Sequence, residues 1–368
     1  MKIGVLTSSR ADYGIYKPLL SKLSQDNRFD LFIIAFGMHL QPQHGNTIVA
    51  IENDDFGIIH KVKGMPTEDS VLDISKGYGE IIVEFSEYWC TNKFDYVFAL
   101  GDRFEMSAAV QSGIPYEINF IHIHGGETTL GSVDNVFRHQ ITLASKIHFT
   151  ATDFFAERVK NIIGDSKNVF NVGSLSLDNL DKVKLPQWPN VCDKFNIPIT
   201  PFILVTFHPE TVNIEQNIKY IDIIKKSLSI LSQKVHILIT LANADSNGRL
   251  YRLMAFDLKN ENQNNFSIID SFGKINYFSA MKNCLFLLGN TSSGIIEAAS
   301  FNKYVLNVGN RQEGRLKSNN TIDIPFNVDK IINTSMNLMK KNQFNGVNLY
   351  KKENTSANII EKILENKR

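Results

Sequence analysis

One stretch decides the fold class: Leu287-Leu288-Gly289-Asn290-Thr291-Ser292-Ser293-Gly294-Ile295-Ile296-Glu297. It runs from apolar residues through a hydroxyl-rich turn into a helical pattern, which is typical of a buried strand that leads into a helix. The first N–H groups of a helix lack internal partners and carry positive potential, so Ser292, Ser293 and Gly294 predict an anion-binding turn. Glu297, one turn further on, is placed to hold a ribose diol. The alternative is a capped helix whose serines only satisfy backbone donors.

Length and composition set the class of protein. The 368 residues exceed what one hydrophobic core usually serves, so we expect two domains. The net charge of +1 gives no support for nucleic-acid binding. Three widely spaced cysteines, Cys90, Cys192 and Cys284, argue against a disulfide framework and fit a reducing compartment. The first apolar run is too short for a signal peptide, and no segment has the length to span a bilayer, so we expect a soluble cytoplasmic protein with no membrane partner.

Apolar runs of strand length alternate with helical patterns along the chain. In the first half they cover residues 3–7, 31–36, 58–62, 96–100, 120–124, 147–150 and 169–172. In the second half they cover residues 202–207, 235–240, 266–269, 285–288 and 304–308, with helices centred near Ile223, Tyr277, Ile296 and Ile331. Runs that are apolar on both faces predict parallel sheets covered by helices. Between them, Val71, Ile74, Tyr78, Ile81, Phe85 and Trp89 form a helical stripe that we expect to face a core.

The alternation lapses between Leu185 and Pro201, where closely spaced prolines predict a linker. We therefore expect an N-terminal Rossmann-like domain at residues 1–185 and a C-terminal, nucleotide-binding Rossmann-like domain at residues 186–350. The last helix, roughly Thr355 to Glu365, should pack back on the first domain, within residues 351–368. The predicted fold class is α/β, with two doubly wound parallel sheets whose strand carboxyl ends face a cleft.

The polar residues of interest follow predicted strands. In the first domain they are Arg10, Ala11, Asp12 and Tyr13, then Gly101, Asp102 and Arg103, and then residues 122–127; in the second they are His208, Pro209 and Glu210, the Ser292-Ser293 turn, and Arg311. Ligands of doubly wound sheets bind at the carboxyl ends of the strands, so this clustering predicts a binding site.

The glycine patterns exclude the commonest nucleotide cofactors. No GxGxxG follows the first strand, and Ile295 stands where a P-loop lysine would be, so neither a dinucleotide cofactor nor an NTPase loop is expected. The diphosphate of a sugar nucleotide fits better, because it needs only helix N–H groups, hydroxyls and one or two arginines. Arg10 and Arg311 are our candidates, although either arginine could be a surface ion pair and Arg311 is hard to separate from Arg315.

Carboxylates and histidines predict acid–base chemistry. Asp102 follows a strand beside Arg103, and its alternative role is that of a helix N-cap. His122 and His124 lie two apart on one strand and should face the same side; they could form half of a metal site, but no further close pair completes a shell, so we expect no metal. His208 precedes a proline and should be extended, with a core histidine as its alternative. Such groups around a cleft suit general acid and base roles.

A series of motifs covers nearly the whole chain: Ser9-Arg10-Ala11-Asp12-Tyr13, Gly37-Met38-His39, His44-Gly45-Asn46-Thr47, Gly101-Asp102-Arg103, His122-Ile123-His124-Gly125-Gly126-Glu127, Phe207-His208-Pro209-Glu210-Thr211 and Gly289-Asn290-Thr291-Ser292-Ser293-Gly294. Together they resemble the hydrolysing UDP-N-acetylglucosamine 2-epimerases, and most closely the bacterial branch that serves sialic or legionaminic acid biosynthesis. The resemblance implies a GT-B fold, a UDP-sugar substrate, no cofactor, and a homodimer or dimer of dimers.

The resemblance also implies the site and its reaction. The catalytic residues would be Asp102, Glu127, Asp134, His208 and His124; the substrate would be bound by Arg10, Ala11, His39, Arg103, His122, Ser292, Ser293, Gly294, Glu297 and Arg311. UDP would leave by anti elimination to a 2-acetamidoglycal, and water would then add to give N-acetylmannosamine.

The sequence departs from the family pattern at two places. His124 stands where many relatives carry glutamate, so the acid–base role could belong to His124, to Glu127 or to neither. Gly14 and Ile15 stand where the animal-type relatives carry serine and lysine. The same reaction on UDP-2,4-diacetamido-2,4,6-trideoxyglucose is the alternative, followed by a GT-B glycosyltransferase and a non-catalytic sugar-nucleotide binding module.

Overall fold

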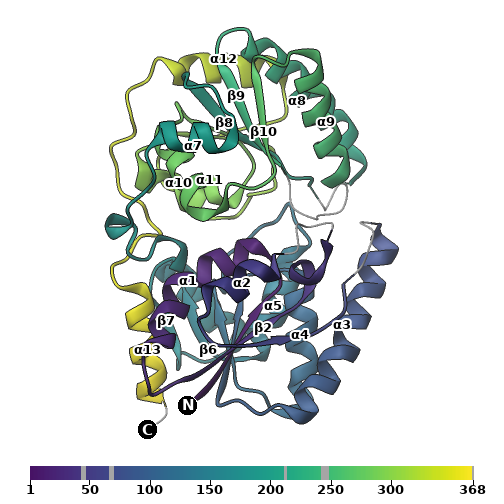
Figure 1. Ribbon diagram of the computed structural model, residues 1–368, viewed down its shortest axis with the longest axis vertical. Helices are drawn as coiled ribbons and strands as arrows, with labels where there is room; N and C mark the ends of the chain where they lie inside the picture. The colour runs from purple at the N-terminus through teal and green to yellow at the C-terminus, as the bar shows by residue number, and fades with distance from the viewer. Residues whose placement is uncertain (43–46, 66–69, 211–213, 242–247, 367–368) are drawn as a thin grey trace. The chain divides into compact units, whose positions relative to one another are not determined.

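A computed structural model describes residues 1–42, 47–65, 70–210, 214–241 and 248–366 of the chain. The chain forms two compact units, which we describe separately (Figure 1). Unit 1 comprises Met1–Glu127, Asp134–Asp181 and Tyr350–Arg368, and unit 2 comprises Thr128–Val133 and Lys182–Leu349. The segment Thr128–Val133, which we call the strap, therefore leaves unit 1 for unit 2 and returns, and the sequence pattern gave no sign of this excursion.

Unit 1 is built on a parallel sheet. In the described residues it has seven strands in the order β3-β2-β1-β4-β5-β6-β7. Its strands are β1 (Lys2–Thr7), β2 (Asp30–Ala35), β3 (Ile58–Lys61), β4 (Tyr96–Leu100), β5 (Phe120–Ile123), β6 (Ser145–Thr150) and β7 (Val169–Asn171). Its helices are α1 (Arg10–Ser24), α2 (Ile48–Asp54), α3 (Val71–Thr91), α4 (Phe104–Gly113), α5 (Asp134–Ala144), α6 (Asp153–Ile163) and α13 (Thr355–Asn366). Short 3-10 turns are η1 (Gly37–Leu40), η3 (Ile114–Tyr116), η4 (Leu175–Leu177) and η5 (Leu180–Lys182).

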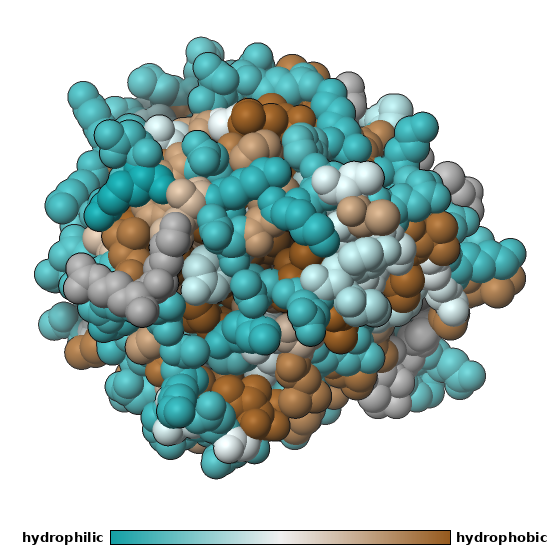
Figure 2. Space-filling model, turned by 90° about the horizontal axis from the view of Figure 1, so that it is seen from below, coloured by the Kyte–Doolittle hydropathy of each residue, from teal (hydrophilic) through white to brown (hydrophobic). Residues whose placement is uncertain are grey.

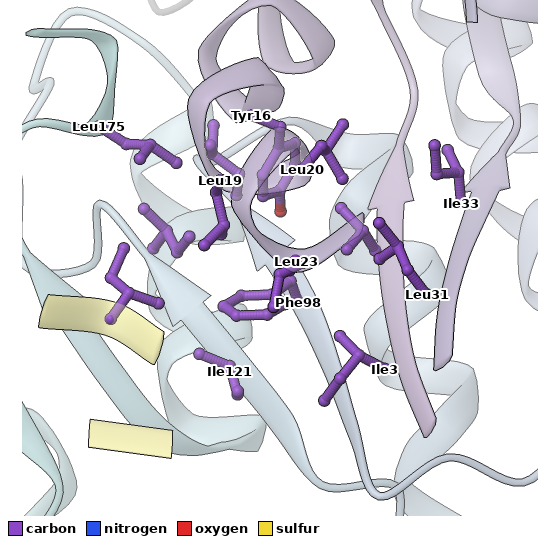
Figure 3. Close-up of a cluster of buried hydrophobic side chains, with 14 of the residues drawn as sticks. Ile3, Tyr16, Leu19, Leu20, Leu23, Leu31, Ile33, Phe98, Ile121 and Leu175 are labelled. Carbon is purple, nitrogen blue, oxygen red and sulfur yellow. The ribbon is translucent and has the colours of Figure 1, made fainter. Parts of the chain in front are cut away.

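Strand alternation divides the core of unit 1 between the two faces of the sheet. Ile3 and Phe98 point to the face covered by α1, where Tyr16, Leu19 and Leu23 pack on them (Figure 3). The intervening positions pack against α3 and α4 on the other face. The final helix α13 contributes buried Ile359, Ile360 and Ile363 to the α1 face. The helical stripe predicted for α3 is largely correct, since Ile81, Phe85 and Trp89 are buried, but Val71 is exposed.

Unit 2 is a second parallel sheet. In the described residues it has six strands in the order β10-β9-β8-β11-β12-β13. Its strands are β8 (Phe202–Thr206), β9 (His236–Thr240), β10 (Phe266–Ile269), β11 (Leu287–Gly289), β12 (Val305–Val308) and β13 (Thr321–Ile324). Its helices are α7 (Trp188–Phe195), α8 (Asn217–Ser232), α9 (Gly248–Glu261), α10 (Gly273–Asn283), α11 (Ser292–Ile296) and α12 (Val328–Met339), with 3-10 turns η6 (Ile214–Gln216) and η7 (Ala298–Phe301).

Part of the predicted linker between Leu185 and Pro201 forms a helix, α7 (Trp188–Phe195). Trp188 begins α7, with a proline in the first turn where no N–H partner is needed. The Trp188 ring stacks on Phe202 with 4.8 Å between ring centroids, and Val191 and Cys192 are buried in the same cluster. Helix α7 is therefore part of the unit 2 core.

Both sheets have the doubly wound strand order, which confirms the predicted fold class of two Rossmann-like α/β units. The strand order reverses between β1 and β4 in unit 1 and between β8 and β11 in unit 2. Ligands of such sheets bind outside the carboxyl ends of the strands at these reversals. In each unit, the residues that follow these strands are therefore the candidate site residues.

On the face shown in Figure 2, hydrophilic residues predominate and apolar residues lie in several separate groups. Among the described residues, no helix combines the length and apolar character needed to cross a membrane.

Candidate functional site

In unit 1, Asp12 organises the turn between β1 and α1. Its carboxylate accepts hydrogen bonds from the Thr7 hydroxyl (2.7 Å), from the Ser8 amide (2.9 Å) and from the Ser9 amide (3.1 Å). Burial alone would raise the pKa of Asp12, but the hydrogen bond and positive charge of His39, with the Thr7 and Ser8 donors, hold the pKa below its usual value. Asp12 is therefore a buried anchor for the start of α1.

Two predicted substrate-binding residues, Arg10 and Ala11, begin α1. A third, His39, contacts Thr7 at the end of β1. Arg10 is half-buried, and among the described residues its guanidinium has no hydrogen-bond or ion-pair partner; Ala11 is exposed. His39 is fully buried, and its Nε2 lies 2.9 Å from the Thr7 hydroxyl while Nδ1 lies 2.7 Å from the Thr47 hydroxyl. Because the Thr7 proton goes to Asp12, His39 Nε2 is the donor to Thr7. The structure thus gives His39 a supporting position and leaves Arg10 available to a ligand.

The loop after β4 carries two charged side chains, and each is held by an oppositely charged buried residue. Arg103 Nε donates to the Glu105 carboxylate at 2.6 Å, and the Glu105 side chain is fully buried. Glu105 also accepts from the Ser8 hydroxyl at 3.2 Å, which links this loop to the Asp12 turn. Asp102 accepts from Nη2 of Arg138, which lies on α5. The N-cap role, the alternative considered for Asp102, is not observed, since Arg103 is the N-cap residue of α4.

Arg138 connects Asp102 with the motif after β5. Its Nη1 donates to the His124 carbonyl at 2.7 Å and lies 3.9 Å from Glu127 Oε2. His124 Nδ1 in turn donates to Glu127 Oε1 at 2.9 Å. The structure therefore brings Asp102, His124 and Glu127 together around one arginine. Asp134 begins α5, four residues before Arg138, and is half-buried.

His122 lies within the sheet and supports the same loop. Its Nε2 is 2.9 Å from the Gly101 carbonyl, and its Nδ1 is 3.1 Å from the Thr142 hydroxyl. A carbonyl can only accept, so Nε2 carries the proton. Burial lowers the pKa of His122 to about 3, so its ring is neutral near pH 7. His122 is fully buried, which places it behind the loop and not on the ligand side.

The expectation that His122 and His124 face the same side rests on strand alternation, which does not reach His124. Strand β5 ends at Ile123, and His124 has a left-handed φ of 67°. Its Nε2 lies 3.4 Å from the Ser174 hydroxyl, whereas His122 contacts Gly101 and Thr142. Within the described residues, no group of three or more metal-ligating side chains is arranged to hold an ion.

In unit 2, Asn290 fixes the backbone at His208. The His208 amide donates to Asn290 Oδ1 at 2.7 Å, and Asn290 Nδ2 donates back to the His208 carbonyl at 2.8 Å. Gln312 Nε2 donates a hydrogen bond to the Asn290 carbonyl at 2.9 Å. His208 itself is buried directly after β8. Two loops that follow neighbouring strands are thereby locked to each other.

Glu210 fixes the turn that carries Arg311. Its Oε1 accepts from the Asn310 amide at 2.6 Å and from the Arg311 amide at 3.1 Å. Gly309 has a φ of 83° in this turn, which an L side chain rarely adopts. Burial raises the pKa of Glu210, although the two amide bonds and the Arg311 charge act in the opposite direction. Arg311 is half-buried on the turn so formed.

The hydroxyl-rich stretch after β11 is a turn and helix, as predicted, but the helix is short. Helix α11 spans Ser292–Ile296 and is capped by Thr291, whose hydroxyl accepts from the Ser293 amide at 3.3 Å. So short a helix has only a small dipole, so any anion binding here depends on individual N–H and O–H groups. Ser292 and Ser293 are half-buried, Gly294 is buried, and the Ser293 hydroxyl donates to the Glu297 carboxylate.

Three residues that shape the site were not predicted to do so: Glu105, Arg138 and Asn290. Asn290 stood inside a quoted motif but was given no role, and Glu105 and Arg138 lie on helices; Glu210 was among the polar residues of interest, without a specific role. Arg138 follows Asp134 by one helical turn, a spacing that could have indicated a shared face. His44, Gly45, Asn46 and Thr211, which complete two of the quoted motifs, lie outside the described residues.

A family model described as UDP-N-acetylglucosamine 2-epimerase matches residues 21–364 of the chain. The chain belongs to this family. A relative from Escherichia coli, polysialic acid biosynthesis protein P7, is 32% identical over 98% of this chain and 92% of its own length. UDP-N,N'-diacetylbacillosamine 2-epimerase (hydrolyzing) from Legionella pneumophila is 31% identical over 96% of this chain and 93% of its own length.

Solved structures of the family share the fold. UDP-GlcNAc 2-epimerase from Neisseria meningitidis, solved with bound UDP-GlcNAc, has a TM-score of 0.80 and 19% identity, covering 99% of this chain and 100% of that one. The two Rossmann-like units thus form a fold of the GT-B type found in these epimerases.

Proposed function

We propose that the protein is a hydrolysing 2-epimerase that converts a UDP-linked 2-acetamido sugar of gluco configuration into UDP and the free manno-configured sugar. The observation that carries the proposal is the loop after β4, where a partly exposed carboxylate, Asp102, is held by a buried arginine. Family membership supplies the reaction class, and the relative from Legionella pneumophila, named as hydrolysing, supports release of a free sugar.

The first step breaks the C2–H bond and the C1–O bond of the sugar nucleotide. The C2 proton goes to a base, the C1–C2 double bond of a 2-acetamidoglycal forms, and UDP leaves with the electron pair of the C1–O bond. Positive charge builds on the sugar ring as negative charge builds on the leaving diphosphate. Asp102, Glu127 or Asp134 would stabilise the former and transfer protons.

The second step adds water to the glycal. A proton is delivered to C2 on the face opposite to the one that lost it, and a water oxygen bonds to C1. The product is a free sugar with inverted configuration at C2. His208 and the carboxylates of unit 1 are the proposed proton carriers.

We propose that unit 2 holds the nucleotide. Arg311, whose backbone is fixed by Glu210, and the N–H and O–H groups at Ser292, Ser293 and Gly294 would bind the diphosphate, and Glu297 would bind the ribose. Arg10 from unit 1, which has no partner among the described residues, would add a second guanidinium to the phosphates. Arg103 and Ala11 would contact the sugar nucleotide at the start of α4 and α1.

Two substrates follow from the relatives. UDP-N-acetylglucosamine is the first, with N-acetylmannosamine for sialic acid biosynthesis as its product, and the polysialic acid relative supports this choice. UDP-2,4-diacetamido-2,4,6-trideoxyglucose is the second, and the diacetylbacillosamine relative supports it. The two differ only at C4 and C6 of the sugar.

The test is to incubate the purified protein with each sugar nucleotide in deuterated water without an acceptor. We expect UDP release and a free manno-configured sugar that carries deuterium at C2. UDP release without an acceptor would argue against a glycosyltransferase, and a product without deuterium would refute elimination. Asp102→Asn should lose about 10³-fold in kcat and keep its affinity for UDP, since it is not proposed to touch the nucleotide.

A further inference from the structure

Arg138 reverses the usual distribution of side chains on an amphipathic helix. On α5, the apolar Val136 and Leu143 are 59% and 63% exposed, whereas Arg138 is 2% exposed. A buried arginine is unfavourable unless its charge and its hydrogen-bond donors are satisfied. Its burial at the expense of nearby apolar residues therefore needs a specific reason.

The contacts of Arg138 give that reason. One terminal nitrogen donates to the Asp102 carboxylate, and the other donates to the His124 carbonyl at 2.7 Å and lies 3.9 Å from Glu127 Oε2. The planar guanidinium fork thus holds the loop after β4 and the loop after β5 at fixed positions. It also holds the carbonyl of His124, which has an unfavourable left-handed backbone conformation.

Exposure separates the roles within this cluster. The Asp102 side chain is 23% exposed, whereas those of Arg138 and Glu127 are 2% and 1% exposed. Glu127 uses one oxygen to accept from His124 Nδ1, and its other oxygen faces Arg138. Of the three charged residues, Asp102 alone has a side chain with substantial access to a ligand.

We infer that Arg138 is a positioning residue for Asp102, and that Glu127 is the buried counter-ion of Arg138 and the orienting partner of His124. The inference deepens the proposed function and rests on it: in this cluster, proton transfer to or from the sugar belongs to Asp102. Neither Glu127 nor the His124 ring, which is 7% exposed, touches the substrate.

Arg138→Lys tests the fork directly. Lysine keeps the charge but presents a single ammonium, which cannot hold Asp102 and the His124 carbonyl in the same geometry. We expect kcat to fall about 10²-fold with KM and UDP affinity within about threefold of wild type. Arg28→Lys is the matched control, because two nitrogens of the Arg28 guanidinium donate to the carboxylate of Asp26, but Arg28 lies on the surface.

Glu127→Gln separates an orienting role from a catalytic one. Glutamine keeps an oxygen that accepts from His124 Nδ1, so we expect kcat to fall about tenfold or less, against about 10³-fold for Asp102→Asn. In the Arg138→Met, Glu127→Gln double variant, the carboxylate of Asp102 loses its cation. The kcat of this double variant should therefore stay as low as that of Arg138→Lys while its affinity for UDP stays near wild type, a split that a purely structural role would not produce.

Thermal unfolding supplies a readout that does not depend on turnover. Arg138→Met leaves Glu127 buried without its cation, so its melting temperature should fall further than that of the double variant with Glu127→Gln. If wild-type protein releases no UDP from either sugar nucleotide, the proposed function is wrong. The melting temperatures of the single and double variants still test whether Glu127 is the counter-ion of Arg138.

Three results would overturn the inference. They are an Arg138→Lys enzyme with wild-type kcat, a Glu127→Gln enzyme as impaired as Asp102→Asn, and no recovery of stability in the double variant.

Discussion

Asn290→Ala should destabilise unit 2, because it removes the hydrogen-bond partners of the His208 backbone. The asparagine side chain makes two hydrogen bonds, one with the His208 amide and one with the His208 carbonyl, and all four groups are buried. A buried polar group left without its partner costs about 1–3 kcal/mol. Two such groups at His208 give an expected loss of about 2–4 kcal/mol in the free energy of unfolding. The upper value is below twice the cost of one group because some water can enter the space that the side chain leaves.

The assay is urea unfolding followed by circular dichroism, with kcat and UDP affinity measured in parallel. Asn276→Ala is the control, since Asn276 makes one hydrogen bond, from Nδ2 to the Phe272 carbonyl within α10, and alanine favours a helix. We expect the control to lose about 1 kcal/mol or less. If Asn290→Ala is no less stable than Asn276→Ala, the argument that the side-chain amide locks the His208 loop is wrong.

Three further predictions concern other parts of the chain. Gly131→Ala places a Cβ 2.4 Å from the Asn310 carbonyl, so it should lower both kcat and UDP affinity, whereas Gly79→Ala, whose Cβ meets open space, should change neither. Glu210→Leu removes the acceptor of the Asn310 and Arg311 amides, and UDP should bind about tenfold more weakly, while Glu210→Gln, which keeps an acceptor oxygen, should bind nearly as wild type. Burial lowers the pKa of His148 to about 4, below its unfolded value, so the unfolded state binds more protons and stability should fall as pH drops from about 6.5 to about 4. Melting temperatures of His148→Leu across this range should show a weaker pH dependence than wild type.

The sheets could be predicted because their strands are buried on both faces. Runs such as those of β4 and β8 are apolar at all but one or two positions, so they can be recognised without knowledge of the neighbouring strands. Strand β13 was missed because its Thr321–Ile324 sequence is polar at alternate positions and only partly buried at the edge of the sheet. Helix α7 was taken for a linker because its prolines were interpreted as breakers, although a proline in the first turn of a helix is well tolerated.

The candidate site was predictable where its residues follow strands. Asp102, His208 and Arg311 lie on loops at the carboxyl ends of the sheets, where topology alone directs attention. Their supporting residues could not be found in this way, because helical periodicity does not tell which charged residue of a helix faces inward. Arg138 is the clearest case, since apolar neighbours on α5 are exposed while it is buried.

The strap gives the molecule an internal mechanical link. Thr128–Val133 belongs to unit 2, and its Leu130 amide donates to the Glu313 carbonyl in the segment that also carries Arg311. The residue directly before it is Glu127, and the residue directly after it is Asp134. A displacement of residues 310–314 would therefore be transmitted through the Leu130–Glu313 hydrogen bond and along the strap to the peptide next to each of these two carboxylates.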